Sequence, residues 1–190
     1  MPQVLLPIGD ATETLDTFYP LFRLPEDGFE VVVAGPEARL YHTVMHEVPP
    51  RADVAPPWDI TRESPGYHLR ATAAFRDIDP AGFAGLYLSG GRAPEYLRYD
   101  RDLLRITRHF FEAGKPVAVV CHGVEIAVAA DCVRGRRMAT VAKCALDVAQ
   151  GGGVYVDDAP VIDGHMVSGR TWHDNTVILR EFVRMLKGGK

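Results

Sequence analysis

The chain has 190 residues, of which 47% are hydrophobic and 24% charged, as in ordinary globular proteins. This length is sufficient for one α/β domain with a sizeable core and short for two. A formal net charge of −4 excludes a broadly basic nucleic-acid-binding surface. No apolar run approaches the roughly 20 residues that span a bilayer, and no signal peptide is recognisable at the start. Three cysteines without a C-x-x-C pair predict free thiols in a reducing cytoplasm.

The first third of the chain begins with regular patterns and then loses them. A buried strand is predicted at 4–8, a helix at 11–24 that Pro20 kinks or breaks, and a second strand at 29–34. From 37 to 70, prolines and scattered aromatic residues interrupt every period, which predicts an excursion with or without a hairpin. Such a segment covers a pocket, meets a neighbouring subunit, or is a surface insertion without a chemical role.

The remainder of the chain alternates between short apolar runs and helical periods. In chain order the pattern predicts a strand at 85–89, a helix at 100–113, a strand at 117–120, a helix at 124–130, a strand at 138–141, a helix at 142–150, strands at 154–156, 159–162 and 166–168, and a helix at 176–186. This alternation predicts a single α/β domain over residues 1–190, with a mostly parallel sheet and helices on both faces.

Residues 117–123, Val-Ala-Val-Val-Cys-His-Gly, carry the sharpest functional signal. The pattern places Cys121 between a buried central strand and a helix, which is the position of a nucleophile elbow. The unpaired N–H groups and partial positive charge of that helix end favour a thiolate over a thiol. A lone cysteine is also a common core residue, but the adjacent His122 and Gly123 favour a reactive thiol. Gly123 fits because an elbow brings strand and helix backbones close together.

Other candidate residues follow strands that end at the same edge of the sheet. His122 can accept the thiol proton if the turn brings it round to the sulfur, and it otherwise points away. Gly90 and Gly91 can offer backbone N–H groups to an oxyanion, or form a flexible turn. Glu13 is a helix-start residue favoured by the dipole, or a buried acid whose raised pKa lets it donate a hydrogen bond to sulfur.

Two further groups of residues are weaker candidates. Trp172 and His173 lie in a loop before the last helix and are pocket candidates, although an N-cap at Asp174 also explains this loop. His42 and His46 have a spacing that suits a metal on a helix, but no helix is expected there. The sequence therefore predicts no metal site and no cofactor.

A family resemblance connects these segments. Glu13, Tyr19-Pro20, residues 31–36, the Ser-Gly-Gly-Arg-Ala-Pro-Glu run at 89–95, residues 114–117, Cys-His-Gly at 121–123 and Gly135-Arg136 together resemble the ThiJ/PfpI superfamily, a class I glutamine-amidotransferase-like group. The PfpI-type intracellular proteases are the branch that the chain resembles most. The resemblance implies a flavodoxin-like three-layer sandwich. The chain departs from the family pattern in two ways. Val141 or a neighbour stands where some members carry a tyrosine near the thiol, and the 37–70 segment is longer than usual.

The resemblance also implies roles for individual residues. Cys121 corresponds to the nucleophile and His122 to its partner. Glu95 corresponds to a carboxylate that reaches a neighbouring subunit, so a homo-oligomer is expected. Glu13 corresponds to the acid that hydrogen-bonds the thiolate, and the N–H groups of Gly91 and His122 correspond to the oxyanion hole.

Three hypotheses for function follow from these assignments. The first is a cytoplasmic cysteine-dependent enzyme, either peptidase-like or glyoxalase III/deglycase-like, that attacks a carbonyl or amide-like group of a small molecule or peptide. The second is a redox or stress-responsive protein in which Cys121 is an oxidation sensor. The third is an interaction role in which the 37–70 segment is the contact surface. Neither a nucleic acid nor a membrane is an expected partner.

Overall fold

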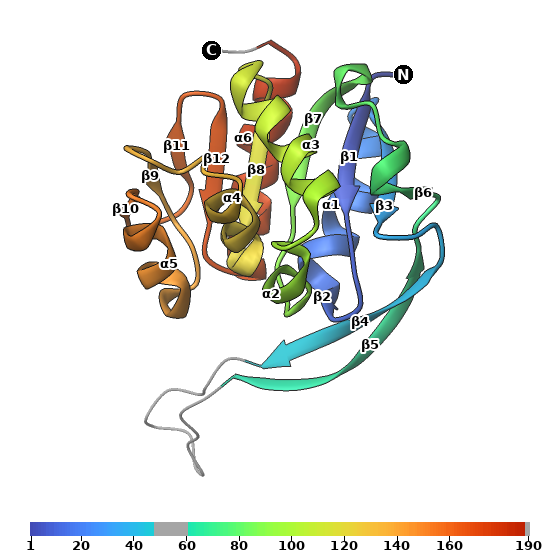
Figure 1. Ribbon diagram of the computed structural model, residues 1–190, viewed down its shortest axis with the longest axis horizontal. Coiled ribbons are helices and arrows are strands. Elements are labelled where there is room, and N and C mark those ends of the chain that lie inside the picture. The colour runs from blue at the N-terminus through green and yellow to red at the C-terminus, as the bar shows by residue number, and fades with distance from the viewer. Residues whose placement is uncertain (48–60, 189–190) are drawn as a thin grey trace.

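A computed structural model describes residues 1–47 and 61–188, which fold around one central sheet (Figure 1). All neighbouring strands in this sheet are parallel except the pair at one edge, β11 and β12. From that edge to the other, the order is β11 (Val161–Asp163), β12 (Met166–Gly169), β8 (Val117–Val120), β7 (Phe83–Leu88), β1 (Gln3–Pro7), β3 (Glu30–Gly35) and β6 (Ala73–Ala74).

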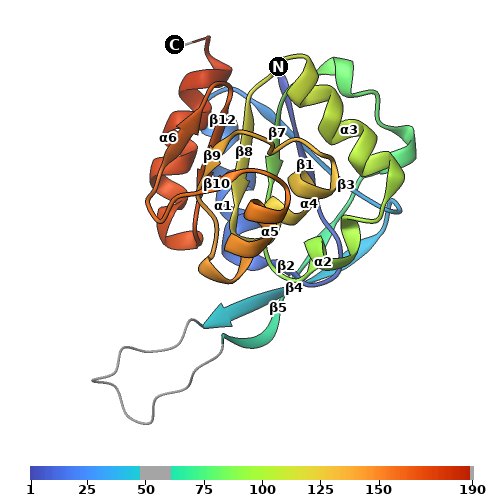
Figure 2. The same ribbon diagram turned by 60° about the vertical axis from the view of Figure 1, so that its left-hand side comes forward.

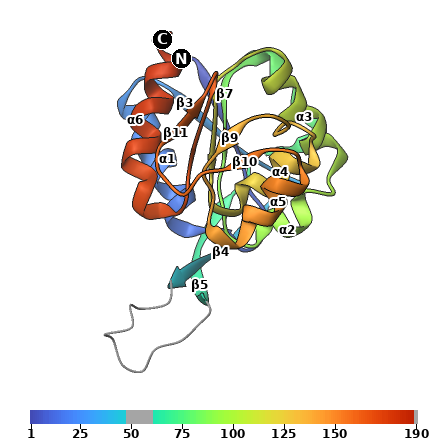
Figure 3. The ribbon, with the colours of Figure 1, turned by 90° about the vertical axis from the view of Figure 1, so that its left-hand side faces the viewer.

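Helices cover both faces of the sheet, as predicted. One face carries α1 (Thr14–Glu26) and α6 (Asn175–Leu186), and the other carries α3 (Arg101–Glu112) and α4 (Val124–Ala129), so that the fold has three layers (Figure 3). The short helices α2 (Ala93–Leu97) and α5 (Ala145–Gln150) lie on the side of α3 and α4. This arrangement is the flavodoxin-like sandwich that the sequence predicts.

The strand β8 lies near the centre of the sheet and is buried on both faces. Its four residues are completely inaccessible to solvent. Val117 and Val119 face the core under α3 and α4, whereas Ala118 and Val120 face the core under α1 and α6. Burial on both faces explains why this run is continuously apolar rather than alternating.

A hairpin forms most of the described part of the excursion that the sequence predicts at 37–70. Its strands, β4 (Leu40–Glu47) and β5 (Arg62–Arg70), are antiparallel, and β4 also pairs in parallel with β2 (Thr12–Glu13). The hairpin extends from the edge of the domain at which β8 leads into α4 (Figures 1 and 2). Residues 48–60 of the predicted excursion lie outside the described residues.

Several predicted boundaries were wrong. The first helix begins at Thr14 rather than at residue 11, because residues 12 and 13 pair with β4. No break occurs at Pro20, which is buried within α1, so packing there outweighs a lost backbone hydrogen bond. The helix at 142–150 starts as a 3₁₀ turn, and β9 (Arg137–Met138) pairs with β10 (Val154–Tyr155) outside the main sheet. Among the described residues, the helices are too short or too polar to cross a membrane.

Candidate active site

Cys121 lies at the sharp turn between β8 and α4. Its φ is +56°, a left-handed conformation that is uncommon for a residue with a side chain. The Thr140 hydroxyl donates to the Cys121 carbonyl across 2.6 Å and holds this turn. A Cβ atom at Gly123 would lie 2.4 Å from the carbonyl oxygen of Leu88, so only glycine fits there. The structure thus forms the predicted elbow, with backbone strain at the residue that carries the thiol.

The loop after β7 lies directly against the Cys121 side chain. A Cβ atom at Gly90 would approach the Cys121 sulfur to 2.8 Å, so the loop can be this close only without a side chain. Gly91 has a φ of +86°, which glycine adopts without strain. The backbone N–H groups of Gly91 and His122 both act on the Cys121 sulfur and lower the pKa of its thiol. The ends of two neighbouring strands therefore bring backbone donors close to the sulfur.

A buried carboxyl group close to the thiol belongs to Asp16, which was not among the residues predicted from the sequence. The Oδ2 atom of Asp16 would lie 2.7 Å from a Cβ at Gly90, on the same side as the sulfur. Asp16 is completely buried, and burial followed by the charge of Glu13 raises its pKa well above the usual range. The Gly90 N–H and the Asn175 amide partly oppose this rise, although neither forms a well-aligned hydrogen bond with the carboxyl.

Glu13 lies one turn before Asp16 and is the N-cap residue of α1. Its Oε2 atom accepts a hydrogen bond from the Asp16 N–H at 2.6 Å. Burial raises the pKa of Glu13 to about 7, against the lowering effect of this hydrogen bond. The helix-start alternative thus describes its position, and its predicted hydrogen bond to sulfur stays a prediction.

His122 is in position to receive the thiol proton. Its Nδ1 atom lies 3.4 Å from the Cys121 sulfur, so the turn brings the two neighbours together. Burial lowers the pKa of His122 to about 4, with smaller contributions from Lys143 and His46. The imidazole is therefore neutral at pH 7 and has a lone pair for a proton.

The thiol itself is poorly accessible. Only 6% of Cys121 is exposed. Burial and the negative charge of Asp16 raise the pKa of Cys121 well above its usual range, whereas the two N–H groups lower it. The sequence predicted that the helix end lowers the pKa of this thiol, and that prediction is wrong. The loss of solvent around the sulfur raises the pKa by more than the backbone N–H groups of the turn lower it. The thiol is therefore protonated at neutral pH, and its attack requires that a base such as His122 take the proton as the sulfur forms its new bond.

A cavity of about 310 Å³ opens onto Cys121 and His122. The remaining lining residues come from the hairpin, from α2 and its preceding residue, and from the turn before α5; they are His46, Thr61, Glu63, Arg92, Glu95, Val141 and Lys143. Val141 lies in the wall of the cavity, as expected for a residue at or near the position where some family members carry a tyrosine. Trp172 and His173 do not line this cavity; their rings stack on each other at 5.2 Å, in a 3₁₀ turn before α6.

Charged side chains of the hairpin connect to the rim of the cavity. The Oε2 atom of Glu63 lies 3.1 Å from His46 Nε2, and its Oε1 atom pairs with Arg92 at 3.3 Å. Arg92 is 3.6 Å from Glu95. Opposite them, Lys143 donates to the Thr61 hydroxyl at 2.9 Å. The hairpin thus supplies part of the pocket wall, which is the first of the three roles weighed for the excursion.

Comparisons with known proteins identify the family to which the chain belongs. A sequence profile of the DJ-1/PfpI family matches residues 2–185. The chain belongs to the DJ-1/PfpI family. This assignment confirms the resemblance to the ThiJ/PfpI superfamily.

Relatives in this family span the whole chain. A deglycase from Thermococcus kodakarensis is 36% identical over 97% of this chain and 99% of its own length. The deglycase PfpI from Pyrococcus furiosus is 32% identical over 97% of this chain and 99% of its own length. Among solved structures, a ThiJ/PfpI domain protein from Brachyspira murdochii superposes with a TM-score of 0.82 at 14% identity, over 100% of this chain and 98% of that one. The last comparison concerns the fold alone.

Proposed function

We propose that this protein is a cysteine-dependent enzyme of deglycase-like type, which acts on adducts of small carbonyl compounds. The observation that carries the proposal is the 3.4 Å approach of the His122 Nδ1 atom to the Cys121 sulfur, beside two backbone N–H donors. The deglycase names of several full-length family relatives support the choice of substrate class.

The first chemical step is thiol addition to a carbonyl group. His122 Nδ1 accepts the Cys121 proton as the sulfur forms a bond to the carbonyl carbon, and the π electron pair moves to oxygen. The resulting oxyanion then accepts hydrogen bonds from the Gly91 and His122 N–H groups, which are close to the sulfur in the free protein. His122 then gives this proton to the oxyanion, which leaves a neutral hemithioacetal on Cys121 and a neutral imidazole.

The size of the cavity favours a small substrate over an extended peptide. Its volume of about 310 Å³ is near the lower end for small-molecule sites. A polar rim with both signs of charge suits a substrate with several polar groups rather than an apolar side chain. The oxidation-sensor alternative has less support, because a buried thiol with a raised pKa reacts slowly with peroxide.

An assay with two kinds of substrate tests the proposal. The purified protein is expected to turn over the hemithioacetal of methylglyoxal with a small thiol, and to leave fluorogenic peptides uncleaved. Cys121→Ala should abolish this turnover, and Cys132→Ala is its matched control. The Cys132 thiol lies outside the cavity and donates to the Ala130 carbonyl. Cleavage of the peptides without turnover of the adduct would contradict the deglycase-like assignment and favour a peptidase.

We also propose that Glu95 supplies the carboxylate that orients His122 across a subunit interface in a homo-oligomer. Within residues 1–47 and 61–188, no carboxylate hydrogen-bonds His122 in its own chain. The Glu95 side chain is 47% exposed at the rim of the same cavity, where it is free to face another subunit. An imidazole that must become a cation is usually stabilised by a carboxylate.

Mixing inactive variants tests this shared site. Cys121→Ala and Glu95→Gln are each expected to have low activity alone. Co-refolded dimers should recover about a quarter of the wild-type activity, because half are hybrids and each hybrid has one intact site. A chain with both substitutions, mixed with either single variant, provides the control. No recovery in the mixture, with hybrids demonstrated by a size tag, would contradict the proposal.

A further inference from the structure

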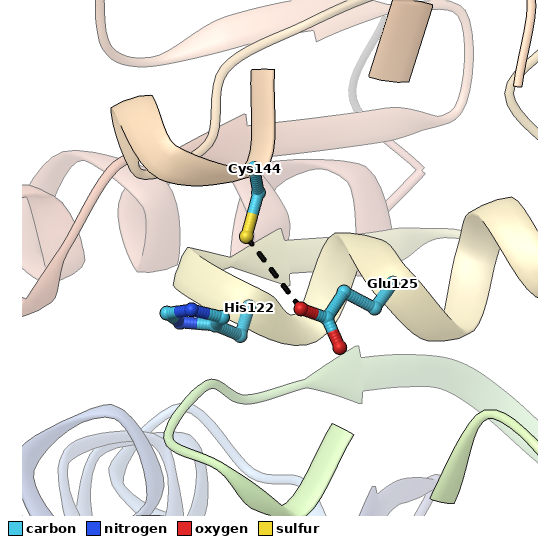
Figure 4. A group of neighbouring side chains, drawn as sticks. All are labelled: His122, Glu125 and Cys144. Carbon is cyan, nitrogen blue, oxygen red and sulfur yellow. Dashed lines mark hydrogen bonds between the residues drawn. The ribbon is translucent and has the colours of Figure 1, made fainter. Parts of the chain in front are cut away.

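A second group of reactive side chains lies beside His122, and the mechanism above uses only one of its members. His122 comes from the elbow, Glu125 from the first turn of α4, and Cys144 from the 3₁₀ turn before α5 (Figure 4). A nitrogen of His122, a carboxylate oxygen of Glu125 and the sulfur of Cys144 all lie within 4.8 Å of one another. The Cys144 thiol donates to Oε1 of Glu125 across 3.7 Å.

The group is buried, and its polar atoms are incompletely satisfied. Glu125 is 7% exposed and Cys144 is 2% exposed. The Oε2 atom of Glu125 is inaccessible and has no hydrogen-bond partner among the described residues. Within residues 1–47 and 61–188, the one ion-pair partner of Glu125 is Arg98, at 3.6 Å, and Arg98 also pairs with Asp147 at 3.5 Å. The Glu125 carboxylate is thus buried, has one oxygen without a hydrogen bond, and shares its arginine with a second carboxylate. A carboxylate in this situation retains affinity for a cation.

The three ligand types match one class of cation. Imidazole, thiolate and carboxylate are the usual protein ligands of Zn²⁺, and a tetrahedral site places neighbouring ligand atoms roughly 3.6 Å apart. The sulfur of Cys144 and the oxygen of Glu125 already have this separation, at 3.7 Å. A His122 nitrogen lies within 4.8 Å of both of these atoms, and His122 also lines the cavity, which gives an ion its path of entry.

We propose that His122, Glu125 and Cys144 form a binding site for a thiophilic divalent cation such as Zn²⁺ or Cd²⁺, with water as the fourth ligand. The ion binds the Cys144 thiolate, the Glu125 carboxylate and neutral His122, and the thiol proton of Cys144 is released to solvent. An ion on the imidazole occupies the group that accepts the Cys121 proton. The site is therefore inhibitory, a consequence that rests on the function proposed above.

Cadmium titration tests the site without reference to turnover. Cd²⁺ bound to a thiolate gives an ultraviolet charge-transfer band, and wild-type protein is expected to show it at one equivalent. Cys121→Ser and Cys132→Ser should retain the band, whereas Cys144→Ser should lose it and Glu125→Gln should weaken affinity at least about tenfold. Thermal unfolding of each variant checks that Cys144→Ser still folds, and Glu125→Gln keeps the test valid if it does not.

Two results would overturn the proposal. Retention of the band in Cys144→Ser with loss in Cys121→Ser would place the ion on the elbow thiol instead. Wild-type affinity in Glu125→Gln would remove the carboxylate from the ligand set. Where the protein has a measurable activity, Zn²⁺ should inhibit wild type at least about tenfold more strongly than Cys144→Ser, with reversal by a chelator. Binding without inhibition would overturn the regulatory part, whereas an inactive wild type that binds Cd²⁺ would contradict only the proposed function.

Discussion

Replacement of Cys121 by alanine is expected to lower kcat/KM for the carbonyl adduct at least about 10⁴-fold, because the covalent step disappears. The remaining Gly91 and His122 donors cannot substitute for a nucleophile. The measurement is steady-state turnover of the hemithioacetal, and thermal unfolding verifies that each variant is folded. Cys132→Ala and Cys144→Ala serve as controls in which a thiol is removed from the same chain, and both should stay within about threefold of wild type.

A second substitution at the same position separates the loss of sulfur from damage to the fold. Cys121 has a φ of +56°, which costs a residue with a Cβ atom about 1 kcal/mol and costs glycine little. Cys121→Gly should therefore be as inactive as Cys121→Ala yet unfold at a higher temperature than that variant. Substantial activity in either variant would contradict a nucleophilic role for Cys121. An equal unfolding temperature for the two would contradict the strain at the elbow.

The elbow is the part of the site that the sequence predicts best, and physical reasons explain why. A fully buried run from 117 to 120 followed by Cys-His-Gly leaves few conformations for the backbone. Glycine is required at 90 because a Cβ atom there would collide with the Cys121 side chain. It is required at 123 because the turn packs directly against the backbone at Leu88. Local pattern and tertiary packing agree here, so the prediction from local pattern holds.

The acid beside the thiol, Asp16, could not be predicted from the local sequence pattern. Glu13 and Asp16 both open the first helix, and the choice between them depends on where that helix begins. With the first helical residue at Thr14, Glu13 is the N-cap and turns back onto the first turn, while Asp16 lies inside it and faces the sheet. The pairing of residues 12 and 13 with β4, which sets this boundary, is a long-range contact that local periodicity does not reveal. An acid at 16, three residues after Glu13, was the available signal.

Long-range placement also explains the other residues that the sequence did not yield. His46 and Glu63 reach the cavity because β4 pairs with β2, which places the base of the hairpin at the edge of the sheet where β8 leads into α4. Glu125 and Cys144 meet because α4 and the turn before α5 lie side by side, although 19 positions separate them in the chain. Trp172 and His173, which follow the strand next to β8, were expected at the pocket, but they stack on each other instead.

Asp16→Asn is expected to raise the free energy of unfolding at neutral pH. The gain over wild type should become smaller as the pH is lowered. The pKa of Asp16 is raised in the folded protein, so the folded state keeps a proton that the unfolded state releases. Below the ordinary pKa of aspartate both states are protonated and the carboxyl costs nothing. Above it, the cost to the folded wild type grows by up to about 1.4 kcal/mol for each pH unit until the folded pKa is reached. Asparagine has no proton to lose and avoids this cost.

The measurement is the difference in unfolding temperature between Asp16→Asn and wild type from pH 4 to pH 7. The difference should be small at pH 4 and should increase in favour of the variant toward pH 7. Glu30→Gln, at an exposed residue at the start of β3, is the matched control and should show no such trend. A difference that stays constant across this range would mean that Asp16 does not hold its proton.

Activity in the same variants then reports what the proton is for. A protonated Asp16 is neutral and can donate a hydrogen bond to the developing thiolate, whereas an ionised Asp16 opposes it by like charge. Asparagine retains a donor, so Asp16→Asn should keep activity within about tenfold of wild type, while Asp16→Ala should lose about 100-fold. In wild type, activity should also fall at alkaline pH as Asp16 ionises, and this fall should be absent from Asp16→Asn. A shared alkaline limb in both proteins would assign it to another group.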